Sequence, residues 1–255
     1  MNESLLINRE DRVLRLTLNR AEKRNALSNS LCLAIVNAVE AAERDPAIGA
    51  LLIDARGPVF CAGMDLDEAL AAAAAEKTAI HERLFTLGAR IKKPIVASVQ
   101  GPALGGGLGL VVNAHVVVAA QGSSFGLTEI RIAMWPYVIF RAMQSAIGHR
   151  RAVELALTGR IFTVNDALNW GIVQEVAPAF ELDDRAAAIA TQLSVSSPET
   201  IRNGLEFAQQ SKGLAEDEAL RLAAEARAPA FASADFREGV LAFREKRRPD
   251  WPSLR

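Results

Sequence analysis

The chain has few of the residues that mark disulfide frameworks and metal sites. Its 255 residues include two cysteines, Cys32 and Cys61, and three histidines. Two cysteines are too few to cross-link a chain of this length, and neither cysteines nor histidines have the spacing of metal ligands. We therefore expect no disulfide framework and no bound metal.

An excess of charge of one sign and a long apolar run are also lacking. The formal net charge is −1, which gives no electrostatic reason to expect nucleic acid or an anionic membrane as a partner. The longest apolar run, Leu108–Ala120, is interrupted by Asn113 and His115 and is too short to span a bilayer. The first ten residues lack the basic and apolar parts of a signal peptide. We therefore expect a cytoplasmic protein.

Half of the residues are hydrophobic, enough for a well-buried core. Short apolar strands are expected over Arg12–Leu18, Ala50–Asp54, Ile95–Gln100 and His115–Ala119, the first of them half-buried. A helix is expected from the N-cap Ser28 to the Asp45–Pro46 pair, and another over Leu108–Ala114. Strands that alternate with helices predict an α/β fold.

The pattern becomes helical after about Arg150. Amphipathic helices are predicted over Arg185–Leu193, Pro198–Gln210 and Leu214–Arg227, and the alanine-rich stretch Ala69–Lys77 is expected to be a mobile surface helix. We predict a core over residues 1–195 and a helical region over residues 196–255, both part of one continuous fold.

Three stretches lie at expected strand-to-helix transitions, where functional residues of α/β folds concentrate. They are Phe60–Leu66, Gly101–Gly109 and Phe125–Glu129. A glycine cluster that opens a helix exposes backbone N–H groups at the positive end of the helix dipole. Two such transitions facing one another can donate two N–H groups to one carbonyl oxygen and stabilise an enolate. The alternative is that the glycines only permit close packing of helix and strand.

These three stretches, together with Leu18–Leu27, Leu157–Val173 and Glu238–Lys246, resemble the successive signatures of the enoyl-CoA hydratase/isomerase (crotonase) superfamily in order and spacing. The resemblance implies a spiral of ββα units with a helical tail that forms a homotrimer or a dimer of trimers. It also implies an acyl-CoA substrate, so that coenzyme A enters with the substrate and no separate cofactor is needed.

The resemblance further implies site residues. The thioester carbonyl would lie between the backbone N–H groups of Met64 and Gly106, which form the oxyanion hole. The residues implied in binding of the substrate and CoA are Lys23, Arg24, Ala26, Ala62, Asp65, Leu66, Gly105, Gly109, Thr128 and Trp135. For Lys23 and Arg24 the alternative is a solvated turn charge, and Trp135 and Tyr137 either line the acyl pocket or pack the core.

The acid–base residues favour one reaction within this family. Hydratases that the chain resembles carry one glutamate two residues after the triple glycine and a second twenty residues later; here these positions hold Gly109 and Glu129. A single acid/base can move a proton between two carbons of an enolate, whereas adding water also requires the nucleophile to be oriented. We therefore predict that Glu129 is the catalytic residue and that Δ3,Δ2-enoyl-CoA isomerisation is favoured. A 2-enoyl-CoA hydratase of fatty-acid or amino-acid degradation is the alternative, and Gly109→Glu should raise hydration if the geometry permits.

Two other readings stay open at this point. One is a CoA-binding protein that has lost its chemistry, although an acid/base at an oxyanion hole has no purpose in a binding module. The other is a serine hydrolase, because residues 122–126 match G-x-S-x-G and Ser124, Glu129 and His149 follow in a suitable order. The acid follows the serine by only five residues, which leaves no room for the strands on which such hydrolases mount it.

Overall fold

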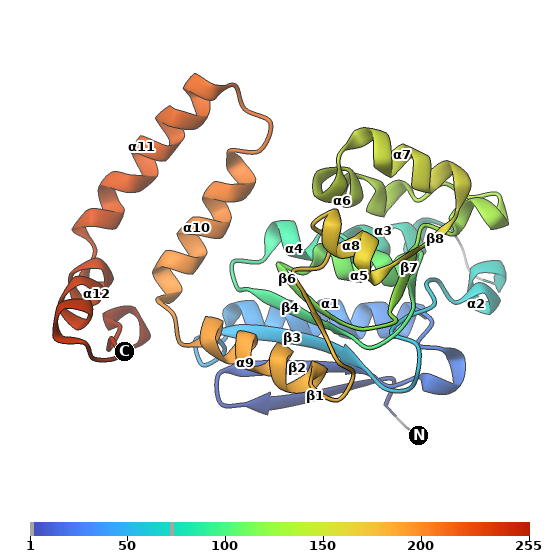
Figure 1. Ribbon diagram of the computed structural model, residues 1–255, viewed down its shortest axis with the longest axis horizontal. Coiled ribbons are helices and arrows are strands. Elements are labelled where there is room, and N and C mark those ends of the chain that lie inside the picture. The colour runs from blue at the N-terminus through green and yellow to red at the C-terminus, as the bar shows by residue number, and fades with distance from the viewer. Residues whose placement is uncertain (1–2, 72–73) are drawn as a thin grey trace.

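A computed structural model describes residues 3–71 and 74–255 of the chain. The main sheet has six strands in the order β1-β2-β3-β4-β6-β9. The bounds of these strands are β1 (Leu5–Glu10), β2 (Val13–Leu18), β3 (Ala50–Ala55), β4 (Ile95–Val99), β6 (Val116–Ala120) and β9 (Glu175–Ala177). Only β1 runs antiparallel to its neighbour, and the other pairs are parallel (Figure 1).

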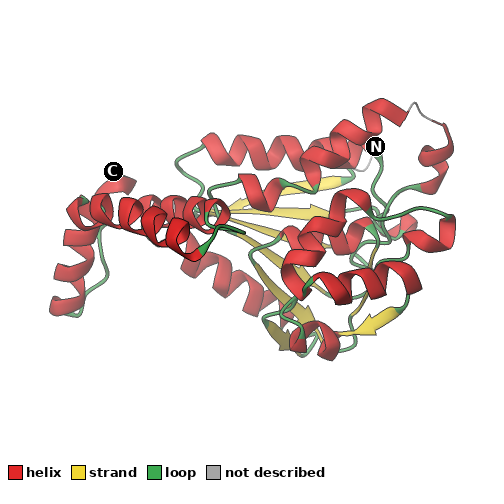
Figure 2. Cartoon of the chain, turned by 90° about the horizontal axis from the view of Figure 1, so that it is seen from above, coloured by secondary structure: helices red, strands yellow, loops and turns green. Residues whose placement is uncertain are grey.

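Helices cover both faces of this sheet (Figure 2). On one face, α1 (Asn29–Arg44), α3 (Ala74–Leu84) and α5 (Gly106–Asn113) form the large core with residues such as Leu16 and Ile53. On the other face, α9 (Leu182–Ser194) forms a second core with residues of opposite parity on the strands, among them Val13, Leu52 and Val96. The two-sided cover explains why β3 and β4 read as continuous apolar runs.

The expectation of a half-buried strand over Arg12–Leu18 is wrong in one respect. Leu16 and Leu18 are buried as expected, but Val13 and Thr17 on the opposite face are buried too. Arg15, which shares that face, hydrogen-bonds to Asp54 and to Asp183 of α9. The polar residues of β2 therefore meet a helix rather than solvent.

A second sheet of three short strands lies beside the glycine-rich segment. It consists of β5 (Ala103–Leu104), β7 (Ser124–Gly126) and β8 (Ile161–Thr163), with β7 in the middle. The strand β5 leads directly into the start of α5, and β7 leads to Thr128 and the 3-10 turn η2 (Glu129–Ile132). This sheet therefore fixes the two segments that carry the glycine cluster and Glu129.

The remaining helices of the core are α2 (Leu66–Ala71), α4 (Leu87–Arg90), α6 (Tyr137–Ile147), α7 (His149–Thr158) and α8 (Val164–Asn169). The surface helix expected over Ala69–Lys77 falls on the end of α2 and the start of α3, and its middle, residues 72–73, lies outside the described residues. None of the helices in the described part of the chain is long and apolar enough to cross a membrane.

The C-terminal arm, residues 196–255, contains α10 (Pro198–Gln210), α11 (Glu216–Ala232), α12 (Ala234–Glu245) and the short turn η3 (Pro252–Leu254). Figures 1 and 2 show that its helices extend away from the core. The base of the arm is held by polar contacts: buried Asp235 accepts hydrogen bonds from Ser197 and Ser253, and the Trp251 indole N–H donates to the carbonyl of Val195 at 2.9 Å.

Candidate active site

Two loops are joined along their backbones to form one end of the site. Cys61 and Ala103 form an isolated parallel bridge, in which the Leu104 N–H donates to the Cys61 carbonyl at 2.9 Å. A Cβ on Gly107 would lie 2.2 Å from that same carbonyl oxygen, a distance that no side chain tolerates. The glycine at position 107 is therefore required for this close approach.

The backbone N–H of Met64 points away from the segment with which it pairs. Met64 bridges Leu27, and the two hydrogen bonds of this bridge are made by its neighbours: the Leu27 N–H donates to Gly63 and the Asp65 N–H donates to Leu27. In an extended segment successive N–H groups alternate in direction. The Met64 N–H therefore faces the opposite side, and it has no acceptor among the described residues.

The second free donor is the N–H of Gly106, the first residue of α5. Such first-turn N–H groups have no partner within their own helix. The preceding Gly105 has φ 52° and ψ −121°, a conformation suited to glycine, and its own N–H donates to Gly126 at 2.8 Å. A Cβ on Gly63 would lie 3.3 Å from the Gly106 nitrogen, so the two donor segments are in contact. Their N–H groups can hold one carbonyl oxygen between them.

Glu129 lies beside these donors, on the turn that follows β7. One carboxylate oxygen, Oε1, is 3.1 Å from the position that a Cβ on Gly105 would take. The other, Oε2, is buried and has no hydrogen-bond partner among the described residues. Burial raises the pKa of Glu129 above its ordinary value, against the opposing effect of a hydrogen bond from its own backbone N–H. A carboxylate with a raised pKa and a free oxygen is suited to accept a proton and to return it.

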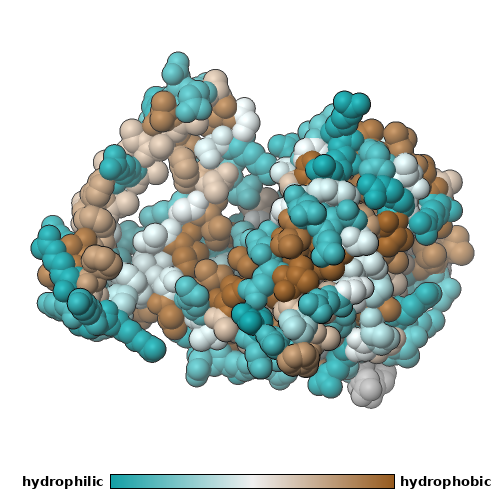
Figure 3. All heavy atoms as spheres, viewed as in Figure 1, coloured by the Kyte–Doolittle hydropathy of each residue, from teal (hydrophilic) through white to brown (hydrophobic). Residues whose placement is uncertain are grey.

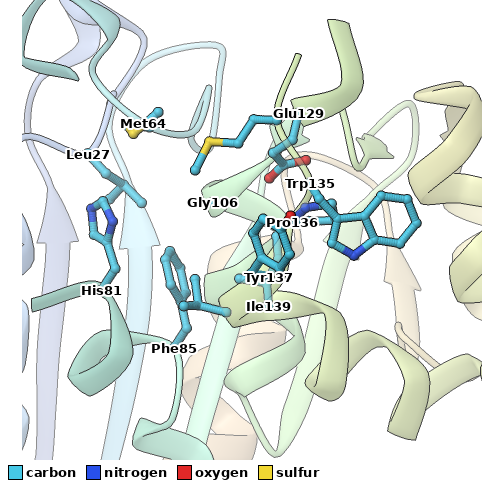
Figure 4. Close-up of a pocket in the computed structure, with 12 residues that line it drawn as sticks. Leu27, Met64, His81, Phe85, Gly106, Glu129, Trp135, Pro136, Tyr137 and Ile139 are labelled. Atoms are coloured by element: carbon cyan, nitrogen blue, oxygen red, sulfur yellow. The ribbon is translucent and has the colours of Figure 1, made fainter. Parts of the chain in front are cut away.

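These groups open onto a mostly apolar cavity of about 190 Å³ (Figure 4). Its lining residues are Leu27, Met64, His81, Phe85, Gly106, Glu129, Met134, Trp135, Pro136, Tyr137, Val138 and Ile139. Glu129 is the one carboxylate among the described residues that line it. The cavity can therefore take an apolar group whose reacting end lies at Met64, Gly106 and Glu129.

Position 109 does not open onto this cavity. A Cβ on Gly109 would lie 2.5 Å from Cγ2 of Ile139 and 2.7 Å from Cε1 of Phe85. Both of these side chains line the cavity, and they cover the glycine. The space into which a side chain at position 109 would project is thus already filled.

The two segments expected to hold CoA lie side by side. The Ala62 N–H donates to the Arg24 carbonyl at 3.0 Å, and Arg20 joins the segments by donating to the Ala26 carbonyl at 2.6 Å and to Asp65 at 3.1 Å. Lys23 is exposed and pairs with Asp67 at 3.3 Å. Buried Asp65 therefore faces Arg20 rather than the cavity, while Leu66, Lys23 and Arg24 are exposed at the edge of the two segments.

Of the other predicted residues, Trp135 lines the cavity and also packs against Phe140, with ring centroids 5.4 Å apart. Thr128 places its hydroxyl oxygen 3.8 Å from the Cβ position of Gly105. Tyr137, for which the sequence left pocket and core open, lines the cavity and is largely exposed.

The sequence did not single out Leu27, His81, Phe85, Met134, Val138 or Ile139 as lining residues. Phe85 follows α3 and is distant in sequence from Glu129, so only the tertiary fold brings the two together. The sequence held one indirect indication of these residues. Gly106 and Gly109 leave one face of α5 without side chains, and because protein interiors are close-packed, a bulky side chain from another segment has to cover that face.

The serine hydrolase arrangement is not formed. Ser124 lies on β7 opposite Thr163, and within residues 3–71 and 74–255 it makes no hydrogen bond to Glu129 or His149. His149 begins α7 and packs against the edge of Phe140 at 6.4 Å. A nucleophile and its base must lie within hydrogen-bond reach, and these residues do not.

Comparisons with known proteins show which family the chain is similar to. The model of the family described as enoyl-CoA hydratase/isomerase matches residues 8–253. A mevalonyl-coenzyme A hydratase of Aspergillus fumigatus is 36% identical over 94% of this chain and 91% of its own length. A 2,3-dehydroadipyl-CoA hydratase of Escherichia coli is 34% identical over 97% of this chain and 98% of its own.

Solved structures extend the comparison to the fold. An enoyl-CoA hydratase of Mycobacterium smegmatis superposes with a TM-score of 0.91 at 29% identity, covering 98% of this chain and 99% of that one. One from Bacillus anthracis gives a TM-score of 0.92 at 26% identity, covering 98% and 100%. The predicted crotonase-like α/β fold with a helical C-terminal region is thereby confirmed.

Proposed function

The chain belongs to the enoyl-CoA hydratase/isomerase family, and we propose that it isomerises a 3-enoyl-CoA thioester to the 2-enoyl-CoA. The proposal rests on the observation that the described lining of the cavity contains a single carboxylate. Glu129 lies at the donors of Met64 and Gly106, and the position of a second carboxylate is filled by Phe85 and Ile139.

The reaction needs one base and a stabilised oxygen. With the thioester oxygen held by the N–H groups of Met64 and Gly106, the Glu129 carboxylate removes a proton from C2 of the acyl chain. The electron pair spreads over the oxygen and C4, and the two N–H groups stabilise the developing negative charge. Glu129 then returns the proton to C4, so the double bond moves from C3–C4 to C2–C3 and no atom is gained or lost.

The same arrangement supports a position for CoA. The segments over residues 23–26 and 62–66 adjoin the Met64 donor, and Lys23 and Arg24 are exposed on them. We propose that the CoA moiety lies along these segments with its phosphates near Lys23 and Arg24. The acyl chain then enters the cavity past Met64 and Leu27.

Hydration of 2-enoyl-CoA is the second candidate. The comparison favours it, because the two relatives described above are both named as hydratases. A hydratase must orient water against C3, and in this cavity Glu129 alone would have to position the water and supply the proton to C2. The alternative therefore predicts a slow reaction at this site.

The proposal is tested with 3-enoyl-CoA and 2-enoyl-CoA substrates and mass analysis of the products. Hydration adds the mass of water, and isomerisation leaves the mass unchanged. Glu129→Gln should lower turnover of both substrates by about 10²–10⁴-fold, because the acid/base is lost, with acyl-CoA binding retained. Glu225→Gln, an exposed change of the same kind on α11, is the control. Full activity of the folded Glu129→Gln variant would contradict the proposal.

A further inference from the structure

A second cavity adjoins the first, and the residues that line both form the wall between them. It has a volume of about 590 Å³ and lies among α3, α4, α5 and α6, with Gln209 and Lys212 at its rim. Three residues line both cavities: Phe85, Tyr137 and Val138. We infer that Phe85 sets the length of the acyl chain that this enzyme accepts, by closing the smaller cavity against the larger one.

The inference rests on the proposed function in one respect, namely that the acyl group of a thioester occupies the smaller cavity. The CoA segments lie on the Met64 side, Phe85 and Ile139 lie across from Met64, and Gly106 lies between Met64 and Phe85 (Figure 4). A chain whose thioester oxygen is bound at Met64 and Gly106 therefore extends toward Phe85. The tail of the acyl chain then contacts the wall that Phe85 forms.

The volume of the smaller cavity limits what it can hold. Its 190 Å³ falls below the range of about 300–1,000 Å³ that is usual for small-molecule sites. The lining is almost entirely apolar, so the cavity suits a short hydrocarbon chain rather than a polar acyl group. A longer chain needs more room, and the room lies behind the wall.

Phe85 is the fixed part of this wall. Its ring is 6% exposed and packs on the bare face of α5: Cζ is 3.2 Å from the Cβ position of Gly106, and Cε1 is 2.7 Å from that of Gly109. Tyr137, in contrast, is 75% exposed and can turn toward solvent, and Val138 is small. Removing the Phe85 ring is therefore the change that joins the two cavities.

The larger cavity can receive the end of a hydrocarbon chain. Ala89, Val112 and Ala142 contribute apolar surface, and Glu82, Arg141 and Lys212 contribute polar groups. A chain that extended past Phe85 would lie on the apolar surface. The polar side chains of the larger cavity would stay in contact with water. No charged group would have to be buried to admit it.

The experiment compares wild type with Phe85→Ala over a series of acyl-CoA lengths, from hexanoyl to dodecanoyl, by calorimetry with saturated chains and by turnover of the matching enoyl-CoA. Wild type should bind the shorter chains better. Phe85→Ala should shift the ratio of dodecanoyl to hexanoyl affinity by at least about tenfold, since burying two methylenes suffices for that factor. Phe180→Ala, which removes an exposed ring that lines neither cavity, should keep the wild-type profile.

Binding of saturated chains requires no chemistry, so this result is independent of whether the enzyme isomerises or hydrates. A failure of the proposed reaction would alter the products and leave the length profile unchanged. If Phe85→Ala does not fold, Phe85→Leu tests the same wall with a smaller cavity left behind. A folded Phe85 variant with the wild-type length profile, or a wild type that already binds dodecanoyl-CoA more tightly than hexanoyl-CoA, would overturn the inference.

Discussion

At the scale of single residues, Glu129 combines a buried carboxylate with a free oxygen at the two backbone donors. Its pKa is raised because burial disfavours the charged form. The base must be deprotonated to act, so kcat/KM should rise with pH through this raised pKa and be lost below it. We predict an acid limb in the pH–rate profile at a higher pH than the ordinary glutamate value of about 4.3. A profile that stays flat down to pH 4 would contradict this assignment.

A substitution can remove the backbone N–H of Gly106 and leave the surrounding residues in place. Gly106→Pro deletes the donor at the first position of a helix, where proline is tolerated. We expect turnover to fall by about 10²–10³-fold. Any Cβ at this position presses on Leu27 and Phe85, at 2.9 and 3.2 Å. Gly106→Ala is therefore the control, because it adds the Cβ and keeps the N–H; equal losses in the two variants would show that sterics, not the donor, matter.

Gly109→Glu was expected from the sequence to raise hydration if the geometry permits. The structure changes this prediction, because Phe85 and Ile139 fill the space. We now expect the single variant to lose about 1–3 kcal/mol of unfolding free energy through overpacking, without gaining hydration. Gly109→Glu combined with Phe85→Ala and Ile139→Ala removes both obstructing side chains and should hydrate 2-enoyl-CoA faster than Gly109→Glu alone. Efficient hydration by Gly109→Glu alone would show that the packing yields.

At the scale of elements, the CoA segments are held by polar contacts rather than by regular structure. Buried Asn25 donates to the carbonyls of Arg56 and Val59, both at 2.8 Å, and accepts from the Arg20 N–H at 2.9 Å. Arg20 in turn reaches Ala26 and Asp65. These contacts position the segment 20–27 against the loop that carries the Met64 donor.

The pKa of Asp65 is lowered: burial opposes the charged form, and hydrogen bonds from Arg20 and from backbone N–H groups outweigh it. The resulting stabilisation is fully present above the unfolded pKa of about 3.9 and is lost as pH falls through the lower folded pKa. Asp65→Asn should cost about 1–3 kcal/mol at pH 7, and the difference from wild type should shrink at pH 3 and below. Melting temperatures at the two pH values measure this. A difference that does not depend on pH would exclude the charge as its cause.

The sequence predicts some elements well and others poorly, for physical reasons. Ser28 caps α1 as predicted, and α10 spans Pro198–Gln210 as predicted, with Ser197 as its N-cap. The edge strand β1 (LLINRE) was missed because it lacks clear alternation. The strands of the small sheet have two or three residues each, too few for an alternation of apolar and polar residues to be recognised. Their positions are set by the tertiary contacts of the loops they join.

At the scale of the whole molecule, the C-terminal arm exposes apolar side chains that a lone chain leaves uncovered. Phe231, Phe236, Leu241 and Phe243 are all exposed, and Figure 3 shows apolar surface along the arm. We propose that the arm packs against neighbouring copies in a trimer or a dimer of trimers. Apolar patches of this kind mark interaction surfaces.

Two variants test this assembly by light scattering. Phe243→Asp places a charge on the most exposed of the four residues, 86% exposed, and should dissociate the assembly toward monomers. Phe180→Asp is the control, because Phe180 is 83% exposed but lies outside the C-terminal arm. Truncation after Ala230 should give a monomer or an aggregate. A stable trimer in both arm variants would contradict the proposal.

The site as a whole could be predicted only in part. Met64, Gly106 and Glu129 lie in motifs that resemble those of the enoyl-CoA hydratase/isomerase superfamily, and this resemblance is what indicated them. Phe85 follows α3 and Ile139 belongs to α6, both outside these motifs, and their side chains reach the cavity through helix packing. The sequence therefore indicates the reacting groups, and the structure adds the walls that select the substrate.

We propose that the single carboxylate of the cavity makes this enzyme an isomerase rather than a hydratase. The most direct measurement is the ratio of kcat/KM for isomerisation of 3-hexenoyl-CoA to that for hydration of 2-hexenoyl-CoA, determined on one wild-type preparation with products identified by mass. We expect a ratio well above one. Rapid hydration of 2-hexenoyl-CoA with no conversion of 3-hexenoyl-CoA would contradict it.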